Sequence, residues 1–230
     1  MSTLTQQDLH FVVSRLPKDL TESAKKHGLI IAGGFIRETV SGGKVSDIDI
    51  FGATVDKLNL AALEISQVRK ARMFSTKNAI TVLSPPRLPL QFITRWLFPD
   101  NAVACIDSFD FTVCQAGIWF ADNKWQSAVS PMFYPDLAAR RLVYTYPARA
   151  EDAGGSMLRV RKFLQRGYSI QSGALAGVIS RLVSSMDFTG RQYAERQAAK
   201  VITGLLREVD PLTVVDGVEL VDEHEVTTEE

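Results

Sequence analysis

Apolar and polar positions in residues 29–51 predict two buried strands with a helix between them. Two short apolar runs, Leu29–Ala32 and Val45–Phe51, have the length and content of buried strands. Between them, Phe35–Val40 has helical spacing and ends at Ser41-Gly42-Gly43. The predicted local order is therefore strand, glycine turn, helix and strand.

The same patterns predict the elements on either side. Helical spacing, with Thr5 as an N-cap and Gly28 as a C-terminal stop, predicts two helices before this segment. Runs of β-branched and aromatic residues predict later strands, and Asp122-Asn123 predicts a hairpin turn. The expected helices are residues 5–16, 19–28, 56–70, 102–106, 134–141, 156–166, 171–186 and 191–209. The expected later strands start at Phe74 and include residues 78–83, 88–97, 109–120 and 124–129.

From Pro131 the pattern becomes helical, which divides the chain into three parts. Residues 1–130 form a core that contains the strands, and residues 131–209 form a helical C-terminal part. Residues 210–230 form an acidic tail that we expect to be poorly ordered at its end. This arrangement predicts an α+β fold.

Two aspartates one residue apart, Asp47 and Asp49, lie in the second apolar run. Side chains at i and i+2 of a strand share a face, so both carboxylates point together while Ile48 and Ile50 pack behind them. Adjacent carboxylates repel each other, and a divalent cation such as Mg²⁺ or Mn²⁺, bound together with substrate phosphates, relieves this. A solvated strand that carries this pair by chance is the alternative, which the flanking apolar residues disfavour.

The glycine pair Gly33-Gly34 stands where the first strand meets the helix. Glycines at a helix start let backbone N–H groups approach phosphate oxygens. Alone, the pair is explained more simply as a tight strand–helix turn. Together with Asp47 and Asp49 on the next strand, it favours a site for a nucleoside triphosphate and a metal ion.

Asp110 is the candidate for a third carboxylate. It lies in the aromatic and apolar run 109–120, where an unpaired aspartate would be unfavourable. If this strand lies beside that of Asp47 and Asp49, three carboxylates converge, as a two-metal mechanism requires. Asp107 is the competing choice, although it has the character of a loop residue.

Composition and motifs argue against several other classes of protein. The chain has 46% hydrophobic residues, no apolar run of membrane-spanning length, and no signal-peptide pattern at its start. Cys105 and Cys114 lie in apolar surroundings, so we interpret them as reduced core residues of a cytoplasmic protein. The three histidines are scattered, which argues against histidine-based catalysis or metal binding. The sequence has no P-loop and no GxSxG motif, so neither a P-loop protein nor an α/β-hydrolase is supported.

The net charge of zero conceals a segregation of charge. Residues 1–136 carry 14 Lys and Arg against 13 Asp and Glu, residues 137–208 carry 12 against 5, and residues 209–230 carry none against 8. The basic part suits an anionic acceptor, and a set of solvated helix faces is the alternative. Within it, Lys162 is the preferred contact to a triphosphate or acceptor backbone.

With these residues in view, the pattern GGFIRE…SDIDIF resembles the head domain of tRNA nucleotidyltransferases and bacterial poly(A) polymerases. These enzymes belong to the DNA polymerase beta-like nucleotidyltransferase superfamily. The chain is also similar in general to uncharacterised nucleotidyltransferase-like proteins of bacteria and phages. Glu38 stands where the family usually has aspartate. The segment that starts at Asp110 is similar to the family's Asp-Phe-Thr-Ile segment, with Ser108-Phe109 in place of arginines. The resemblance covers about residues 28–120.

This resemblance implies a small mixed β-sheet with packed helices. It implies that the triphosphate lies on Gly33 and Gly34, and that Asp47, Asp49 and Asp110 bind the metals. A nucleoside monophosphate would pass from ATP or another NTP to a hydroxyl group, with pyrophosphate as the second product.

Two further residues are expected near the donor nucleotide. Ser46 is expected to donate to a phosphate, while Arg37 is expected either to reach a phosphate or to pair near Glu38. The expected acceptor is RNA, such as a tRNA end, with protein or a small molecule as other acceptors. The alternative functions are a catalytically silent module that binds RNA or protein, and a toxin-like transferase that acts on a protein.

Overall fold

The computed structural model describes residues 1–99, 101–147, 153–184, 214–215 and 218–219. It contains two compact units, Met1–Pro147 and Ala148–Glu230. Residues 131–147 belong to the first unit, whereas the sequence places a boundary after residue 130. The helix expected over 191–209 and the end of the acidic tail lie outside the described residues.

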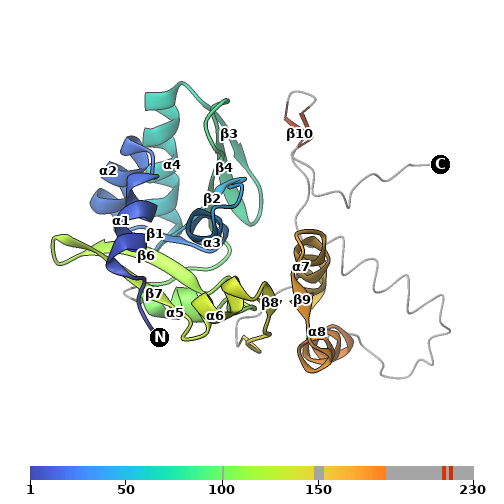
Figure 1. The fold of residues 1–230 in the computed structure, drawn as a ribbon. Helices are drawn as coiled ribbons and strands as arrows, with labels where there is room; N and C mark the ends of the chain where they lie inside the picture. The colour runs from blue at the N-terminus through green and yellow to red at the C-terminus, as the bar shows by residue number, and fades with distance from the viewer. Residues whose placement is uncertain (100, 148–152, 185–213, 216–217, 220–230) are drawn as a thin grey trace, which may run out of the picture. The chain divides into compact units, whose positions relative to one another are not determined.

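A seven-stranded mixed sheet is the centre of the first unit, with strand order β3-β4-β5-β2-β1-β6-β7 (Figure 1). Strands β2 and β5 are parallel, and the other neighbours are antiparallel. The mixed sheet confirms the predicted α+β class. The strands are β1 (Ile30–Ala32), β2 (Ile48–Phe51), β3 (Arg72–Ser75), β4 (Ala79–Leu83), β5 (Leu90–Ile93), β6 (Ala116–Ala121) and β7 (Lys124–Val129), with a short β8 (Arg141–Leu142) after them.

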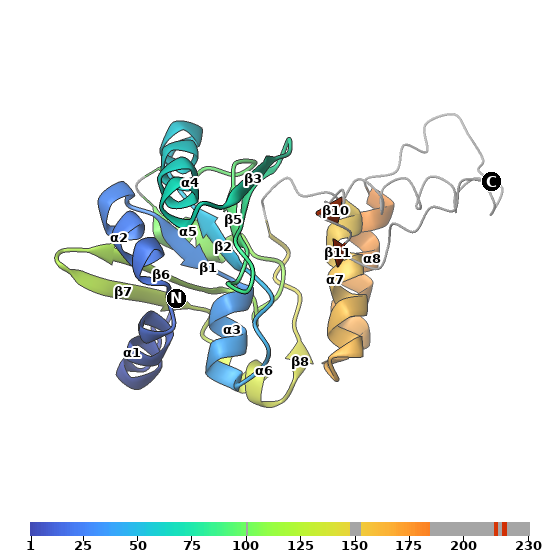
Figure 2. The same ribbon diagram turned by 90° about the horizontal axis from the view of Figure 1, so that it is seen from above.

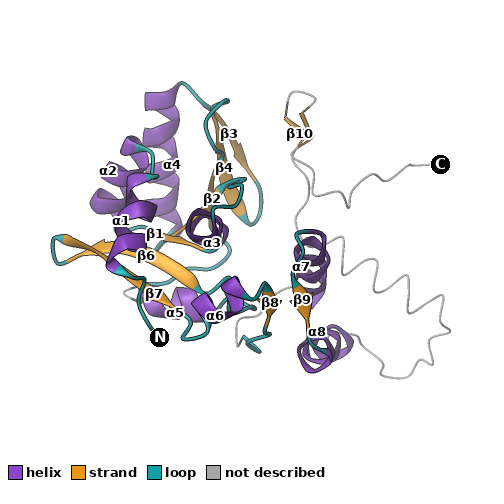
Figure 3. Ribbon diagram, viewed as in Figure 1, coloured by secondary structure: helices purple, strands orange, loops and turns teal. Residues whose placement is uncertain are grey.

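Helix ends follow the signals in the sequence (Figure 3). The Thr5 side chain accepts a hydrogen bond from the Asp8 amide, which confirms it as an N-cap. Gly28 and Gly42 end their helices in the left-handed conformation, with φ of 65° and 71°. The helices of the first unit are α1 (Gln6–Ser14), α2 (Lys18–His27), α3 (Gly34–Ser41), α4 (Val55–Arg69), α5 (Ala102–Asp107) and α6 (Phe133–Ala138).

One face of the sheet is apolar and lies against α2 and α4, which also pack on each other (Figure 2). Ile31, Ile50, Phe92 and Ile80 lie directly opposite one another in successive strands, and each is 2% exposed or less. Burial of such a side chain contributes about 1.5–3 kcal/mol to the stability of the fold. This face is therefore the main core of the unit.

The opposite face is divided between a packed part and a polar part. Over β1 and β6 it is covered by α5, and Ile106 of this helix occupies the space that a Cβ at Gly117 would need. Cys105 packs there with Ala32 and Phe51. Asp49 lies on the same face because it is directly opposite Ala32.

The prediction of a strand over residues 109–120 is wrong for the first half of that range. Only β6, from Ala116, is a strand, and residues 108–115 form a buried loop. Gln115 holds this loop by donating from Nε2 to the carbonyl oxygens of Asp107 and Phe109, at 3.0 and 3.3 Å. Aromatic and β-branched residues indicate burial as much as extended backbone, so a buried loop gives the same signal.

Two other predicted elements differ in extent. The strand expected over 88–97 is shorter in the structure, where β5 spans Leu90–Ile93. In α4, Leu58 and Ile65 are buried, whereas Leu60, Leu63 and Val68 are exposed. A helix that rests on one sheet face buries a single stripe, and these three side chains lie outside it.

The second unit contains α7 (Ala153–Gln165), β9 (Ser169–Ile170) and α8 (Ser172–Ser184), and the two helices pack on each other. Strands β10 (Val214–Val215) and β11 (Val218–Glu219) form an antiparallel pair. Gly167, with φ of 79°, follows α7 as the sequence predicts. Among the described residues, no helix has the length and apolar content needed to cross a membrane.

Candidate active site

The turn between β1 and α3 is built on Gly33. Its φ of 80° lies in the region that favours glycine, and its N–H donates to the Ala116 carbonyl at 2.8 Å. A Cβ at this position would lie 3.2 Å from the Phe109 ring and 3.7 Å from Oδ2 of Asp49. The turn, the Phe109 ring and the Asp49 carboxylate therefore meet at one point.

Helix α3 begins directly after this turn, at Gly34. The amides of a first helical turn have no acceptor inside the helix and carry the positive end of its dipole. Because the Gly33 amide is used by β6, the amides that follow it are the ones that suit a phosphate. Phosphate binding by Gly33 and Gly34 remains a prediction.

The two aspartates lie at the start of β2. Asp49 is in the strand, and Asp47 immediately precedes it. Ile48 and Ile50 are fully buried on the apolar face, so the half-buried Asp49 projects from the opposite face. Gln91 of β5 lies directly opposite Asp49 and bonds to Asp47, which brings all three side chains together.

Both carboxylate oxygens of Asp47 accept hydrogen bonds within the protein. Oδ1 accepts from the Ser46 hydroxyl at 2.7 Å, and Oδ2 accepts from Nε2 of Gln91 at 3.1 Å. Each carboxylate oxygen retains a further lone pair for a ligand. The two donors fix the orientation of the carboxylate, as partners of metal-binding side chains commonly do.

Arg37 lies inside the protein, with 5% of its surface exposed. Its Nε and Nη2 lie 3.0 and 2.9 Å from Oε1 of Glu38, and Nη1 donates to the Cys114 sulfur at 3.4 Å. Gly43 leaves space for the Glu38 carboxylate, which occupies the position of a Cβ. Of the two roles expected for Arg37, the structure contains the pairing with Glu38.

Asp110 lies in the buried loop before β6 and is 1% exposed. Its carbonyl oxygen accepts from the Thr145 amide at 3.0 Å. Within the part of the chain that the structure describes, no three His, Cys, Asp or Glu side chains are grouped to hold a metal ion. Asp47 and Asp49 are therefore considered as a pair, and Asp110 as a third ligand remains a prediction.

Lys162 lies half-buried on α7, in the second unit. Its proposed contact with a triphosphate or an acceptor remains a prediction. In the same unit the Tyr168 ring packs edge-on against Phe163, with centroids 4.9 Å apart.

Two residues of this site have no role in the sequence analysis, namely Gln91 and Phe109. Gln91 interrupts the apolar run of β5 at a position that alternates with buried Leu90 and Phe92. This alternation places Gln91 on the polar face, but only the pairing of β5 with β2 shows that it reaches Asp47.

The chain matches one protein family. A family model described as Gabija anti-defense 2 family protein matches residues 3–140. A protein described as "Gabija anti-defense 2", from Bacillus phage SPbetaL7, is 27% identical over 180 residues. That alignment covers 78% of this chain and 43% of the relative, so the chain spans less than half the length of that relative.

Solved structures of CCA-adding enzymes share the fold. The Thermotoga maritima CCA-adding enzyme complexed with tRNA superposes with a TM-score of 0.56 at 15% identity, over 92% of this chain and 52% of that one. CCA-adding enzyme structures with CTP and with ATP give TM-scores of 0.55 and 0.56, both at 15% identity, and cover 88% of this chain. The two alignments cover 51% and 50% of the enzyme chains, so this chain spans about half the length of those enzymes. The first unit therefore has a nucleotidyltransferase-like fold, as the sequence resemblance implies.

Proposed function

This chain belongs to the Gabija anti-defense 2 family, and we propose that it is a metal-dependent nucleotidyltransferase. It moves a nucleoside monophosphate from an NTP to a hydroxyl acceptor and releases pyrophosphate. The observation that carries this proposal is the meeting of the Asp49 carboxylate, the Gly33 turn and the start of α3. The fold shared with enzymes solved with CTP and ATP supports it.

The donor triphosphate lies against the start of α3 in this proposal. Gly33 allows a close approach because it has no side chain, and the Gly34 amide and those that follow it bind phosphate oxygens. Ser46, which is exposed beside Asp47, donates to a phosphate when the nucleotide is bound. These contacts orient the triphosphate towards the two carboxylates.

Asp47 and Asp49 fit the requirements of a Mg²⁺ or Mn²⁺ site. Mg²⁺ commonly uses one or two protein carboxylates and completes its ligands with phosphates and water. The half-buried pair, with Asp47 oriented by Gln91, offers that set. The metal supplies neutralisation of the triphosphate charge and Lewis acidity. Asp110, beside the Phe109 ring that contacts the Gly33 turn, is our candidate for a third ligand and for accepting the hydroxyl proton.

The acceptor in this proposal is RNA, with a tRNA end as the first to be tested. A CCA-adding enzyme with this fold is solved with tRNA, and Lys162 lies in a basic segment suited to an RNA backbone. The family name leads us to propose that the reaction acts in the cytoplasm against the Gabija defence. The reaction would then modify an RNA on which that defence or its host depends.

A labelled-transfer experiment tests the proposal. The full chain is incubated with Mg²⁺ or Mn²⁺, one α-³²P-labelled NTP at a time, and tRNA, total RNA or cell protein. Label in RNA with wild-type protein, and none with Asp49→Asn, supports the proposal. Label in no acceptor with any NTP and either metal overturns it.

The burial of Asp110 and Arg37 favours one second candidate, a catalytically silent nucleotidyltransferase-like module that binds RNA or a partner protein. This function needs the fold but not the carboxylates. It predicts that Asp47→Asn combined with Asp49→Asn leaves binding and the anti-defence effect unchanged. Loss of that effect in the double variant excludes the silent module.

A further inference from the structure

The face of the sheet that carries Asp49 extends across β5 and β4 to the edge strand β3. Phe74, Thr81, Gln91 and Asp49 lie directly opposite one another in these four strands, so their side chains share this face. Thr81 and Gln91 are half-buried, whereas their neighbours on the apolar face are fully buried. Among the described residues, α4 is the helix that packs on β3, β4 and β5, and it lies on the apolar side.

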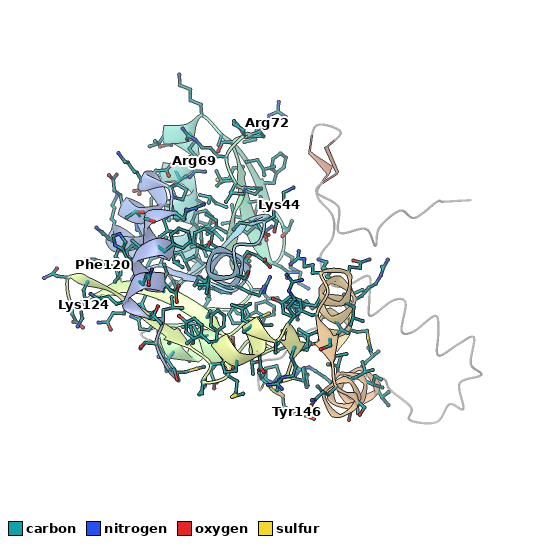
Figure 4. The ribbon with its side chains drawn as sticks, viewed as in Figure 1. Lys44, Arg69, Arg72, Phe120, Lys124 and Tyr146 are labelled. Atoms are coloured by element: carbon teal, nitrogen blue, oxygen red, sulfur yellow. The ribbon has the colours of Figure 1, made fainter. Side chains whose placement is uncertain are left out.

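The segment that contains β3, β4 and β5 has an unusual charge. Residues 65–99 contain six Lys and Arg and no Asp or Glu, although the whole chain has a net charge of zero. One of the six, Arg69, has a fully buried side chain, which pairs with Asp19. Arg72, two residues before Phe74 on the edge strand, shares its face. Figure 4 shows Arg72 on the opposite side of the first unit from Lys124, which lies at the tip of the β6–β7 hairpin.

We propose that the meander face, defined as the side chains of Arg72, Phe74, Thr81 and Gln91, binds a single strand of nucleic acid. The terminal hydroxyl of the bound strand lies at Asp47 and Asp49. The inference rests on the proposed function and adds a surface for the acceptor.

Three features of the meander face match this ligand. Arg72, the one basic side chain of this face, complements a phosphate, and residues 65–99 contain no acidic residue to oppose it. Phe74 is half-buried on the same face and offers a ring on which a base can stack. The row from Phe74 to Asp49 crosses three strand spacings, about 14 Å. A segment that faces an acidic protein would share the charge but would need neither the aromatic ring nor a site for phosphates at its end.

Binding is measured by fluorescence anisotropy of a labelled single-stranded 12-mer, as RNA and as DNA, with the full chain in EDTA. Phe74→Leu, which keeps apolar bulk but removes the ring, is expected to weaken binding about 5- to 100-fold. Arg72→Gln is expected to reduce the slope of log affinity against log salt by about 0.7. Lys124→Gln, at the tip of the β6–β7 hairpin, serves as the matched control and is expected to change neither the affinity nor its salt dependence. Thermal melts establish that each variant is folded.

A preference between the RNA and DNA arms identifies the source of the strand. Equal binding by wild-type, Phe74→Leu and Arg72→Gln overturns the proposal. So does binding of polyglutamate, but of neither oligonucleotide, which would indicate an acidic protein partner.

The two proposals can fail separately. Ring-dependent binding without transfer to any acceptor would refute the enzyme and retain the surface. Transfer to RNA that is indifferent to Phe74 and Arg72 would refute the surface and retain the enzyme.

Discussion

Gln91 donates a hydrogen bond to Oδ2 of Asp47 across 3.1 Å, from the strand that runs parallel to β2. The same glutamine lies directly opposite Asp49. One neutral side chain therefore connects the two carboxylates through the pairing of their strands. A donor that holds a metal-binding carboxylate tunes metal affinity without contacting the metal.

Replacing Gln91 with leucine is expected to weaken Mn²⁺ binding in the presence of NTP about 10- to 100-fold. The physical reason is that Asp47 loses the donor that orients it. Electron paramagnetic resonance of free Mn²⁺ measures the affinity. Gln126→Leu is the matched control, because Gln126 donates to Oδ2 of exposed Asp122 at 3.2 Å on the β6–β7 hairpin. Equal affinities in both variants would show that Gln91 has no positioning role.

Gly33→Ala is expected to abolish nucleotide binding. The new Cβ lies 3.2 Å from Phe109 and 3.7 Å from Asp49, and the positive φ adds about 1–2 kcal/mol of strain. Gly28→Ala provides a control, since its φ is 65° but nothing lies within 4 Å of its Cβ. In urea, Gly33→Ala is expected to lose more stability than Gly28→Ala, because its Cβ also crowds the Phe109 ring. Normal nucleotide binding by Gly33→Ala in isothermal titration would contradict the proposed phosphate site.

Arg37→Leu distinguishes a structural arginine from a phosphate-binding one. Because Arg37 and Glu38 are largely buried, loss of the pair is expected to lower the free energy of unfolding by about 3 kcal/mol. Arg15→Leu, which removes an exposed arginine that lies over the Phe11 ring, is expected to cost about 0.5 kcal/mol. Urea unfolding measures both. An unchanged urea midpoint with a raised KM for NTP would assign Arg37 to the substrate instead.

Asp19 makes the stability of the first unit depend on pH. Hydrogen bonds from the buried side chain of Arg69 lower the pKa of Asp19 from its ordinary value of 3.8. A lowered folded-state pKa contributes stability above the unfolded-state value, and this contribution is lost as pH falls through the folded-state value. Asp19→Asn is therefore expected to lose about 1–3 kcal/mol at neutral pH.

The same variant should approach wild-type stability as the pH falls below about 3.8. Urea unfolding of both proteins across this range measures the difference. A stability difference that stays constant down to the lowest pH at which both proteins fold would assign the effect to packing rather than to the ion pair.

Elements with strong local signals could be predicted from the sequence. The order β1, glycine turn, α3 and β2 follows from apolar runs and glycines, and the hairpin follows from Asp122-Asn123, whose φ values are both positive. Thr5 and Gly28 likewise define helix ends within their own segments.

Features that depend on long-range packing could not. The loop of Phe111 has the composition of a strand because it is buried, and its shape depends on hydrogen bonds from Gln115 and on Tyr144, 33 residues away along the chain. Leu60 is apolar, as a core residue is, but lies outside the stripe of α4 that meets the sheet. The role of Gln91 appears only when β5 pairs with β2, which no local pattern specifies.

The rate of label transfer from α-³²P-NTP to RNA in a single turnover tests the central claim most directly. It is compared between wild-type, Asp49→Asn and Asp56→Asn, the last an exposed aspartate in the first turn of α4. We expect Asp49→Asn to lose about a thousandfold in rate and Asp56→Asn to match wild-type. Transfer by Asp49→Asn at the wild-type rate would contradict the assignment of Asp47 and Asp49 as the catalytic pair.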